Sequence, residues 1–209
     1  MPAINESIVR EYFETLGYLV SQPCKYGVPG RHKKAEEELD LLVQHPLVTE
    51  HRVPERIVWT TVDLGTVARA IVGVWGWHSE RIYLGRFQQM PEMLRFAEPA
   101  VRRLAEARLG GGPVAAILCL PELPVSGELK EKTLHGLKER GVDGVLSFRT
   151  MLQELIVHVD ANRNYEKSDV LQLLRILKTY RLVKDSQMEL FGTRKRRRRA
   201  PRPEASPAT

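Results

Sequence analysis

The chain has 209 residues, of which 43% are apolar and 28% are charged, and its formal net charge is +6 at pH 7. This composition predicts a folded domain with its own core, and no apolar run approaches the roughly 18 residues of a membrane-spanning helix. The first residues show no export signal, and the two cysteines, Cys24 and Cys119, form no metal-binding pair. We therefore expect a cytoplasmic protein without membrane contact.

The net charge is concentrated at the C-terminal end. Residues 193–209 hold seven basic residues against one acidic residue, whereas residues 1–192 carry 25 residues of each sign. The end segment has no large apolar side chains to pack. We therefore expect a disordered basic tail behind a formally neutral folded part.

The first half of the chain predicts one helix and then several strands. Apolar residues recur at helical spacing in the first segment, with Asn5 as a candidate N-cap and Gly17 as a candidate C′ residue. The apolar residues of this helix are Ile8, Val9, Tyr12, Phe13 and Leu16. A short strand at 18–21, a basic loop at 24–34, a strand at 39–43, a β-branched stretch at 56–61 and a buried strand at 67–77 follow.

The second half predicts alternating helices and strands. Pro91 and Pro99 suit the first positions of a short and a longer helix, and Ser126 can cap a helix that runs to Gly141. Strands are expected at 114–120 and 142–148, in parallel, and two more helices at 150–160 and 166–183. The fold class is therefore α/β, with a mixed central sheet flanked by helices. We expect a domain over 1–160, a C-terminal helical extension over 161–192 packed on it, and a tail over 193–209.

The order of these elements and three short motifs resemble the PD-(D/E)xK restriction-endonuclease-like superfamily, and within it Mrr-type nucleases and Holliday-junction resolvases. The motifs are Gly17-Tyr18-Leu-Val after the first helix, Leu39-Asp40-Leu-Leu-Val, and Val72-Gly73-Val74-Trp75-Gly76-Trp77. The likeness spans roughly residues 5–80. It implies a restriction-endonuclease-like fold in which the strands around Asp40 and Gly73 are neighbours in one sheet, with these two residues close together at one end and the first helix packed on that sheet.

The resemblance also implies a chemistry that this chain has partly lost. Family members bind Mg²⁺ through an Asp and a Glu and use a Lys to orient the attacking water. Asp40 matches the Asp, and Glu6 matches a further acidic residue that resolvases carry on the first helix. Gly73 and Trp75 stand where the Glu and the Lys are expected. We therefore predict a remnant site without a cofactor, or with Mg²⁺ if the chain is active, and expect Gly73→Glu with Trp75→Lys to restore weak cleavage.

Two interpretations of Asp40 stay open, because a lone carboxylate in a strand is either a remnant metal ligand or a hydrogen-bonded residue at a strand edge. If ligands have migrated, Glu80, Asp63 and His78 are the candidates to restore the metal site. Trp75 and Trp77 are expected to pack on the sheet.

Basic residues predict contact with nucleic-acid phosphates in a sequence-independent manner. One group lies in the loop beside Asp40 and the other is a run of six consecutive basic residues in the tail. These residues are Lys25, Arg31, Lys33 and Lys34 in the loop, and Arg194, Lys195, Arg196, Arg197, Arg198 and Arg199 in the tail.

Three functions therefore remain in view. The first is a DNA-associated, nuclease-like pseudoenzyme with impaired catalysis. The second is an active Mg²⁺-dependent endonuclease with migrated catalytic residues. The third is a scaffold whose C-terminal helix docks a protein partner while the tail solubilises the chain.

Overall fold

The structure is a computed structural model that describes residues 3–23, 39–76, 78 and 82–183. The helices and strands are α1 (Ala3–Thr15), β1 (Leu19–Ser21), β2 (Leu41–Gln44), α3 (Thr61–Leu64), β3 (Arg69–Val74), α4 (Leu84–Gln89), the 3₁₀ helix η1 (Pro91–Ala97), α5 (Pro99–Arg108), β4 (Ala115–Leu120), α6 (Gly127–Glu139), β5 (Gly144–Ser147), α7 (Phe148–His158) and α8 (Asp169–Thr179).

Five strands form one mixed sheet in the order β1-β2-β3-β4-β5. β2 runs antiparallel to both β1 and β3, whereas β3, β4 and β5 are parallel to one another. Helices connect the parallel strands, as a parallel pair requires a long crossover. The predicted α/β class, with a mixed sheet flanked by helices and β4 parallel to β5, is confirmed.

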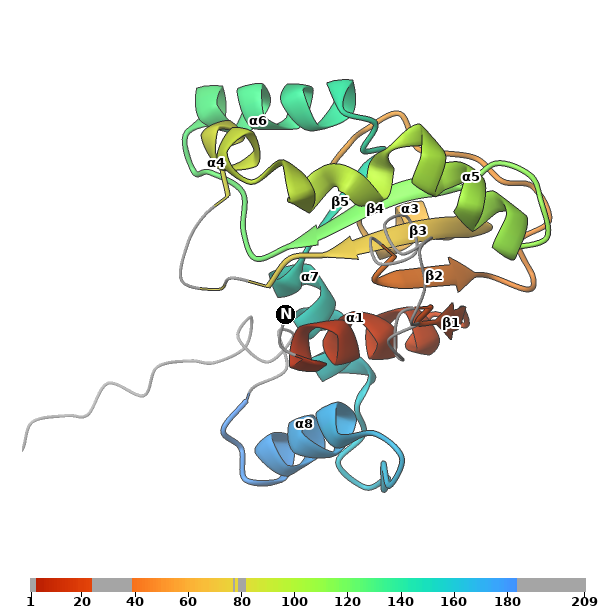
Figure 1. The fold of residues 1–209 in the computed structure, drawn as a ribbon. Helices are drawn as coiled ribbons and strands as arrows, with labels where there is room; N and C mark the ends of the chain where they lie inside the picture. The colour runs from red at the N-terminus through yellow and green to blue at the C-terminus, as the bar shows by residue number, and fades with distance from the viewer. Residues whose placement is uncertain (1–2, 24–38, 77, 79–81, 184–209) are drawn as a thin grey trace, which may run out of the picture.

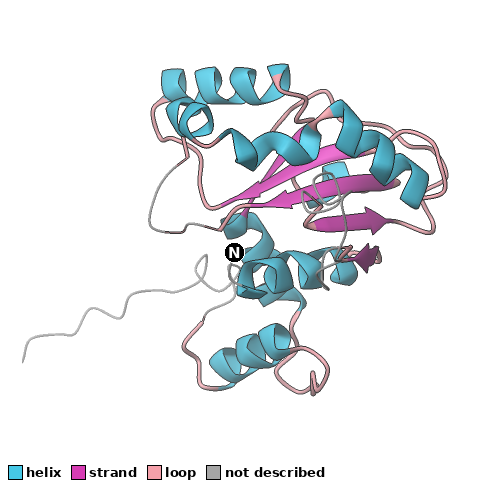
Figure 2. Cartoon of the chain, viewed as in Figure 1, coloured by secondary structure: helices cyan, strands magenta, loops and turns pink. Residues whose placement is uncertain are grey.

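Helices cover both faces of this sheet (Figures 1 and 2). Successive side chains of a strand point to opposite faces, so Val72 joins a core that includes α1 and α7, while Ile71 joins a core that includes α4, η1, α5 and α6. α1 packs on the first face through the fully buried Tyr12 and Phe13, with Ile8 and Leu16 partly buried beside them, as the helical pattern predicted.

Local signals place most element ends where the sequence predicts them. Gly17 has a φ of +89°, the left-handed conformation expected of a residue just after a helix. Pro91 and Pro99 open η1 and α5, and Ser126 is the N-cap of α6. The β1 strand begins one residue after Tyr18.

One local expectation is wrong. Asn5 is not an N-cap: it lies inside α1, where its side chain bonds to a distant part of the chain. The β-branched stretch 56–61 makes a single bridge, Val58 to Val145, on the outer edge of β5, and its last residue begins α3. Trp59 explains this bridge, because its ring packs over Gly144, where an added Cβ would lie 2.3 Å from the indole.

The last helix packs beside α1 and α7 instead of on the sheet (Figure 1). α8 is shorter than the predicted 166–183: Ser168 caps it by accepting a hydrogen bond from the Leu171 N–H at 3.2 Å. Lys178 donates to the carbonyls of Ile156 and Val159 at 2.8 and 2.7 Å, which ties α8 to the end of α7. No helix within the described part of the chain is long and apolar enough to cross a membrane.

Candidate functional site at the carboxyl edge of the sheet

Asp40 and Gly73 lie side by side at the edge of the sheet where β3 ends. β2 and β3 pair with Leu41 opposite Val72, so the next positions outward are Asp40 and Gly73. The Asp40 carboxylate accepts a hydrogen bond from the Val74 N–H, with 2.7 Å between Oδ2 and the nitrogen. The expected position of these two residues, together at one end of one sheet, is confirmed.

The hydrogen bond gives Asp40 a structural task. The Trp75 N–H donates to the Cys119 carbonyl of β4 at 2.9 Å, and successive N–H groups of a strand point to opposite sides, so the Val74 N–H points towards β2. β2 begins only at Leu41. The Asp40 side chain therefore supplies the acceptor that the backbone of a longer β2 would have supplied, which favours its interpretation as a hydrogen-bonded residue at a strand edge.

An aromatic ring fills the space next to Asp40. A Cβ atom added to Gly73 would lie 2.5, 2.6 and 2.9 Å from three carbon atoms of Phe96. Phe96 belongs to η1, is 3% exposed, and is part of the core on that face of the sheet. Trp75 is partly buried and packs against the same core, as expected of a residue on the sheet face. Any side chain at Gly73 therefore requires Phe96 to move.

This packing argues against the expectation that Gly73→Glu with Trp75→Lys restores cleavage, because the introduced side chain would begin inside the contact distance of the Phe96 ring. The residues also do not fit the Mg²⁺ that the resemblance implies. Mg²⁺ requires oxygen ligands, and the two motif positions offer one carboxylate bonded to the Val74 N–H and one glycine under a phenyl ring. Within the ranges that the structure describes, no group of three or more His, Cys, Asp or Glu is arranged to hold a metal ion.

Cys119 lies on β4 beside this edge. It is fully buried and pairs with Val74. Burial, and then the negative charge of Asp40, raise the pKa of the Cys119 thiol. The thiol is therefore protonated at neutral pH and is no nucleophile, since the thiolate is the reactive form.

Asn5 and His78 form a polar contact at the same edge that the sequence did not reveal. The Asn5 amide donates to the Gly76 carbonyl at 3.2 Å, and its Oδ1 lies 3.0 Å from His78 Nε2. Asn5 is 2% exposed and occupies the space a Cβ on Gly76 would need, and the His78 ring meets Phe148 edge to face. The contact anchors the start of α1 to the chain leaving β3. In the sequence, Gly76 was the one signal that could have pointed to this close approach.

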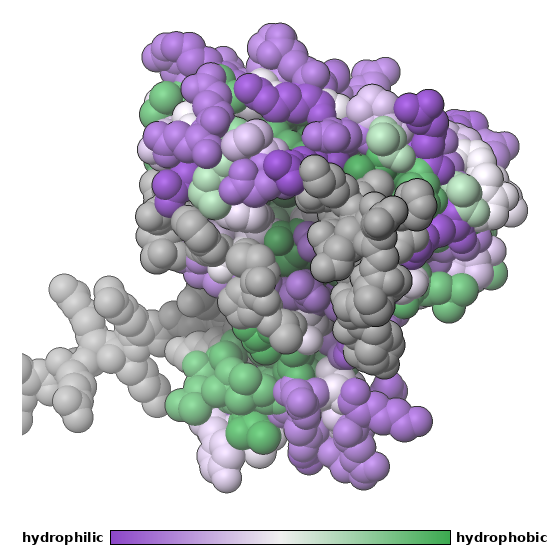
Figure 3. All heavy atoms as spheres, in the orientation of Figure 1, coloured by the Kyte–Doolittle hydropathy of each residue, from purple (hydrophilic) through white to green (hydrophobic). Residues whose placement is uncertain are grey.

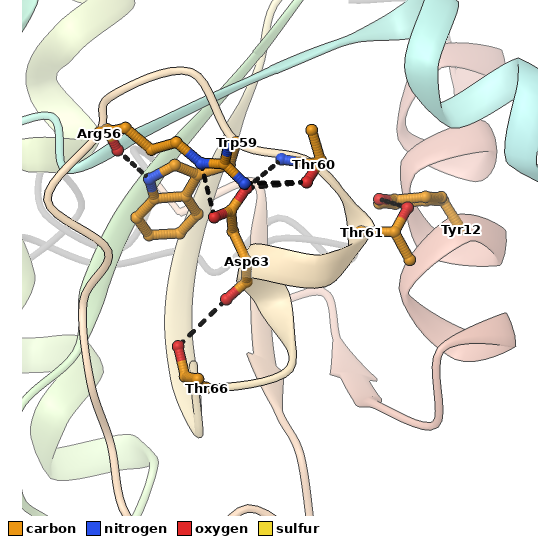
Figure 4. Close-up of polar contacts among 7 residues, drawn as sticks. All are labelled: Tyr12, Arg56, Trp59, Thr60, Thr61, Asp63 and Thr66. Atoms are coloured by element: carbon orange, nitrogen blue, oxygen red, sulfur yellow. Dashed lines mark hydrogen bonds and ion pairs between the residues drawn. The ribbon is translucent and has the colours of Figure 1, made fainter.

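Glu6 and Asp63 have partners that do not involve Asp40. Glu6 accepts a hydrogen bond from Gln22 at 3.2 Å. Asp63 lies before β3, whereas Asp40 lies beside the far end of that strand, and Arg56 binds both of its oxygens at 2.7 and 2.6 Å (Figure 4).

Asp63 also accepts from the backbone N–H of Thr60 at 2.7 Å in a capping box. Burial alone would raise the pKa of Asp63, but the hydrogen bonds from Arg56 and Thr60 and the charge of Arg56 outweigh it, so the pKa lies below its usual value. Asp63 thus stabilises the start of α3 and forms an ion pair with Arg56.

Several predicted site residues lie outside the described part of the chain. The structure offers no test of Trp77 or of Glu80 as a migrated ligand. The same holds for the predicted phosphate-binding residues Lys25, Arg31, Lys33, Lys34 and 194–199. Contact between these basic residues and nucleic-acid phosphates therefore stays a prediction.

A hollow of about 650 Å³ lies away from this edge, between η1, the start of α5 and the end of α6. Arg102 and Asp143 line it, but they bind each other at 2.6 Å, and Asp143 also accepts from the Ala116 N–H at 2.7 Å. Arg102 further donates to the carbonyls of Val114 and Gly141. This pair joins α5 to the starts of β4 and β5. Its polar atoms therefore stabilise the fold.

Comparison of the chain with protein-family models, with characterised proteins and with solved structures finds no match.

Proposed function

We propose that this chain is a nucleic-acid-associated protein that uses a nuclease-like frame without cutting. The observation that carries the proposal is the contact between Gly73 and Phe96. At the position where a nuclease of this kind needs its second carboxylate, the chain has no side chain, and a buried phenyl ring takes the space.

The remaining chemistry at this edge is weak. Asp40 is the one motif carboxylate, and its Oδ2 accepts from the Val74 N–H. Trp75 offers an indole N–H but no positive charge to orient water or stabilise a phosphorane. Loss of one such group typically slows a reaction by about 10²–10⁴-fold, and here two are replaced. The geometry of this edge therefore argues against catalysis.

The nucleic-acid part of the proposal rests on charge. Residues 1–192 are formally neutral, and the run 194–199 supplies six consecutive positive charges. Such a run neutralises phosphates without contacting base edges, so binding should be independent of sequence and steeply dependent on salt.

A cleavage assay tests the loss of catalysis. Wild-type protein should show no Mg²⁺- or Mn²⁺-dependent cleavage of duplex, branched or single-stranded DNA above background. Asp40→Asn is the matched variant, because it removes the charge while keeping an oxygen that can accept from the Val74 N–H. Robust cleavage by the wild type that Asp40→Asn abolishes would overturn the proposal and favour an active endonuclease with migrated ligands.

A salt titration tests binding. Each phosphate contacted on B-DNA contributes a slope of roughly −0.9 in log K against log salt, so a chain without residues 193–209 should lose most of its affinity and much of this slope. Neutralising Lys25, Arg31, Lys33 and Lys34 tests the loop beside Asp40. If only the loop variant loses affinity, the sheet edge is the DNA surface. If no binding is seen at low salt, the scaffold function replaces this proposal.

A further inference from the structure

α8 carries an apolar stripe on the side away from the core. Leu173, Ile176 and Tyr180, spaced three and four residues apart, are 54%, 41% and 73% exposed, and Leu182 just beyond the helix is 72% exposed. The opposite side of α8 is buried against the rest of the molecule through Val170, Leu171 and Leu174. Figure 3 shows apolar side chains gathered over this part of the surface. We call Leu173, Ile176, Tyr180 and Leu182 the α8 stripe.

The end of α8 turns the chain in a specific way. The Leu182 N–H bonds to the Leu177 carbonyl at 2.9 Å and the Arg181 N–H to the Lys178 carbonyl at 2.9 Å, which is the Schellman pattern. Arg181 takes the left-handed position of this motif, with a φ of +56°, where glycine is usual. A side chain at such a φ is strained, so the interactions that hold this turn outweigh the strain.

The chain beyond the turn contains a segment that matches the α8 stripe. The described residues end at Val183, next to the stripe, and 26 residues follow. Their large apolar side chains are confined to four consecutive positions, as Met188, Leu190 and Phe191. The other residues of the segment are polar, charged or small.

We propose that residues 188–191 fold back onto the α8 stripe and cover it. Reach permits this: Val183 and Met188 are five residues apart and can span about 17 Å, whereas Leu173 and Tyr180 are separated by about 10 Å along the helix. Met188 and Phe191 are three positions apart, so a single helical turn places both on one side, where both can face the stripe. The short tether keeps the effective concentration of the segment high, on the order of millimolar.

Docking of this segment is reversible. Three large apolar side chains gain from burial, but four residues lose backbone freedom, and these contributions are of the same order. The consequence concerns the basic run, because Arg194 lies three residues after Phe191 and is held within about 10 Å of α8 when the segment docks. The docking itself requires no nucleic acid, so it can be tested independently of the proposed function.

The experiment uses the full chain without nucleic acid and measures NMR contacts between the Phe191 ring and the methyl groups of Leu173 and Ile176. We expect nuclear Overhauser contacts between them, and a loss of the ring-induced methyl shifts in the variant Leu190→Ala/Phe191→Ala. Gln187→Ala, a polar change in the same segment, is the matched control and should preserve the shifts. The methyl groups of Leu129, exposed on α6, should not respond to either variant.

The reciprocal change gives a second readout. Ile176→Ser, at a position that is partly exposed, should remove the Phe191 contacts while thermal unfolding confirms that the fold is intact. Contacts observed only between differently labelled chains in a mixed sample would show that a second copy covers the stripe. Absence of any contact, with methyl shifts unchanged in the double variant, would show that the stripe is bare or reserved for another protein. Either result would overturn the proposal.

Discussion

Substitution of Gly73 by alanine tests the packing that separates this chain from a nuclease. Gly73 pairs with Leu118 of β4, and on its other side the next residue, Val74, donates to the Asp40 carboxylate, so the backbone here is held on both sides. The added methyl carbon would lie 2.5 Å from the nearest Phe96 carbon, against an ordinary contact of about 3.5–4.0 Å. The Phe96 ring must therefore retreat by about 1 Å into a core where it is 3% exposed.

The expected magnitude follows from two opposing effects. Overpacking a core by one carbon typically costs about 1–3 kcal/mol, while replacing glycine within a strand recovers roughly 0.5–1 kcal/mol of backbone entropy. We therefore expect Gly73→Ala to lower the free energy of unfolding by about 1–2 kcal/mol. Phe96→Leu should relieve the clash, so the two changes should be coupled favourably by about 0.5–3 kcal/mol in a double-mutant cycle.

Urea unfolding measures these free energies, with the midpoint and the m-value reported separately. Gly127→Ala is the matched control, because an added Cβ there meets no atom within 4 Å and the residue opens α6. It should leave the midpoint unchanged or raise it. Gly73→Ala with the stability of the wild type, or a double variant whose losses simply add, would refute the reasoning about Phe96.

Three further outcomes are expected from unfolding experiments. Tyr18→Phe should cost about 1–3 kcal/mol, because the buried hydroxyl lies 2.7 Å from two carbonyl oxygens that would lose their partner. Asp63→Ala should cost about 1–2 kcal/mol through loss of the capping box and of the bond to Arg56. Because the pKa of Asp63 is lowered, that difference should persist above about pH 4 and vanish as the wild type is acidified through the depressed pKa. His51 accepts backbone hydrogen bonds through Nδ1, and burial followed by the charge of Arg69 lowers its pKa. Wild-type stability should therefore be complete above about pH 6.5 and decline as the pH falls below it, a decline that His51→Gln should reduce.

Local patterns in the chain were sufficient for much of the architecture. Alternating or continuous apolar runs located all five strands, and Gly17, Pro91, Pro99 and Ser126 marked helix ends, because each of these signals acts within a few residues. The neighbourhood of Asp40 and Gly73 also followed from sequence, through the order of elements that the resemblance suggested. The location of the net charge needed only counting.

The state of the candidate site depended on contacts between distant residues. Phe96 and Gly73 are 23 positions apart, and Asn5 and Gly76 are separated by 71. Neither contact produces a recognisable pattern in the sequence. A glycine that packs under an aromatic ring cannot be distinguished there from a glycine in a loop. Only when helices close over both faces of the sheet does Phe96 meet Gly73 and the Asp40 carboxylate meet a backbone N–H. The sequence thus determined which elements form, whereas tertiary packing decided which side chains fill the space around Gly73 and Asp40, because that depends on which residues occupy the same volume.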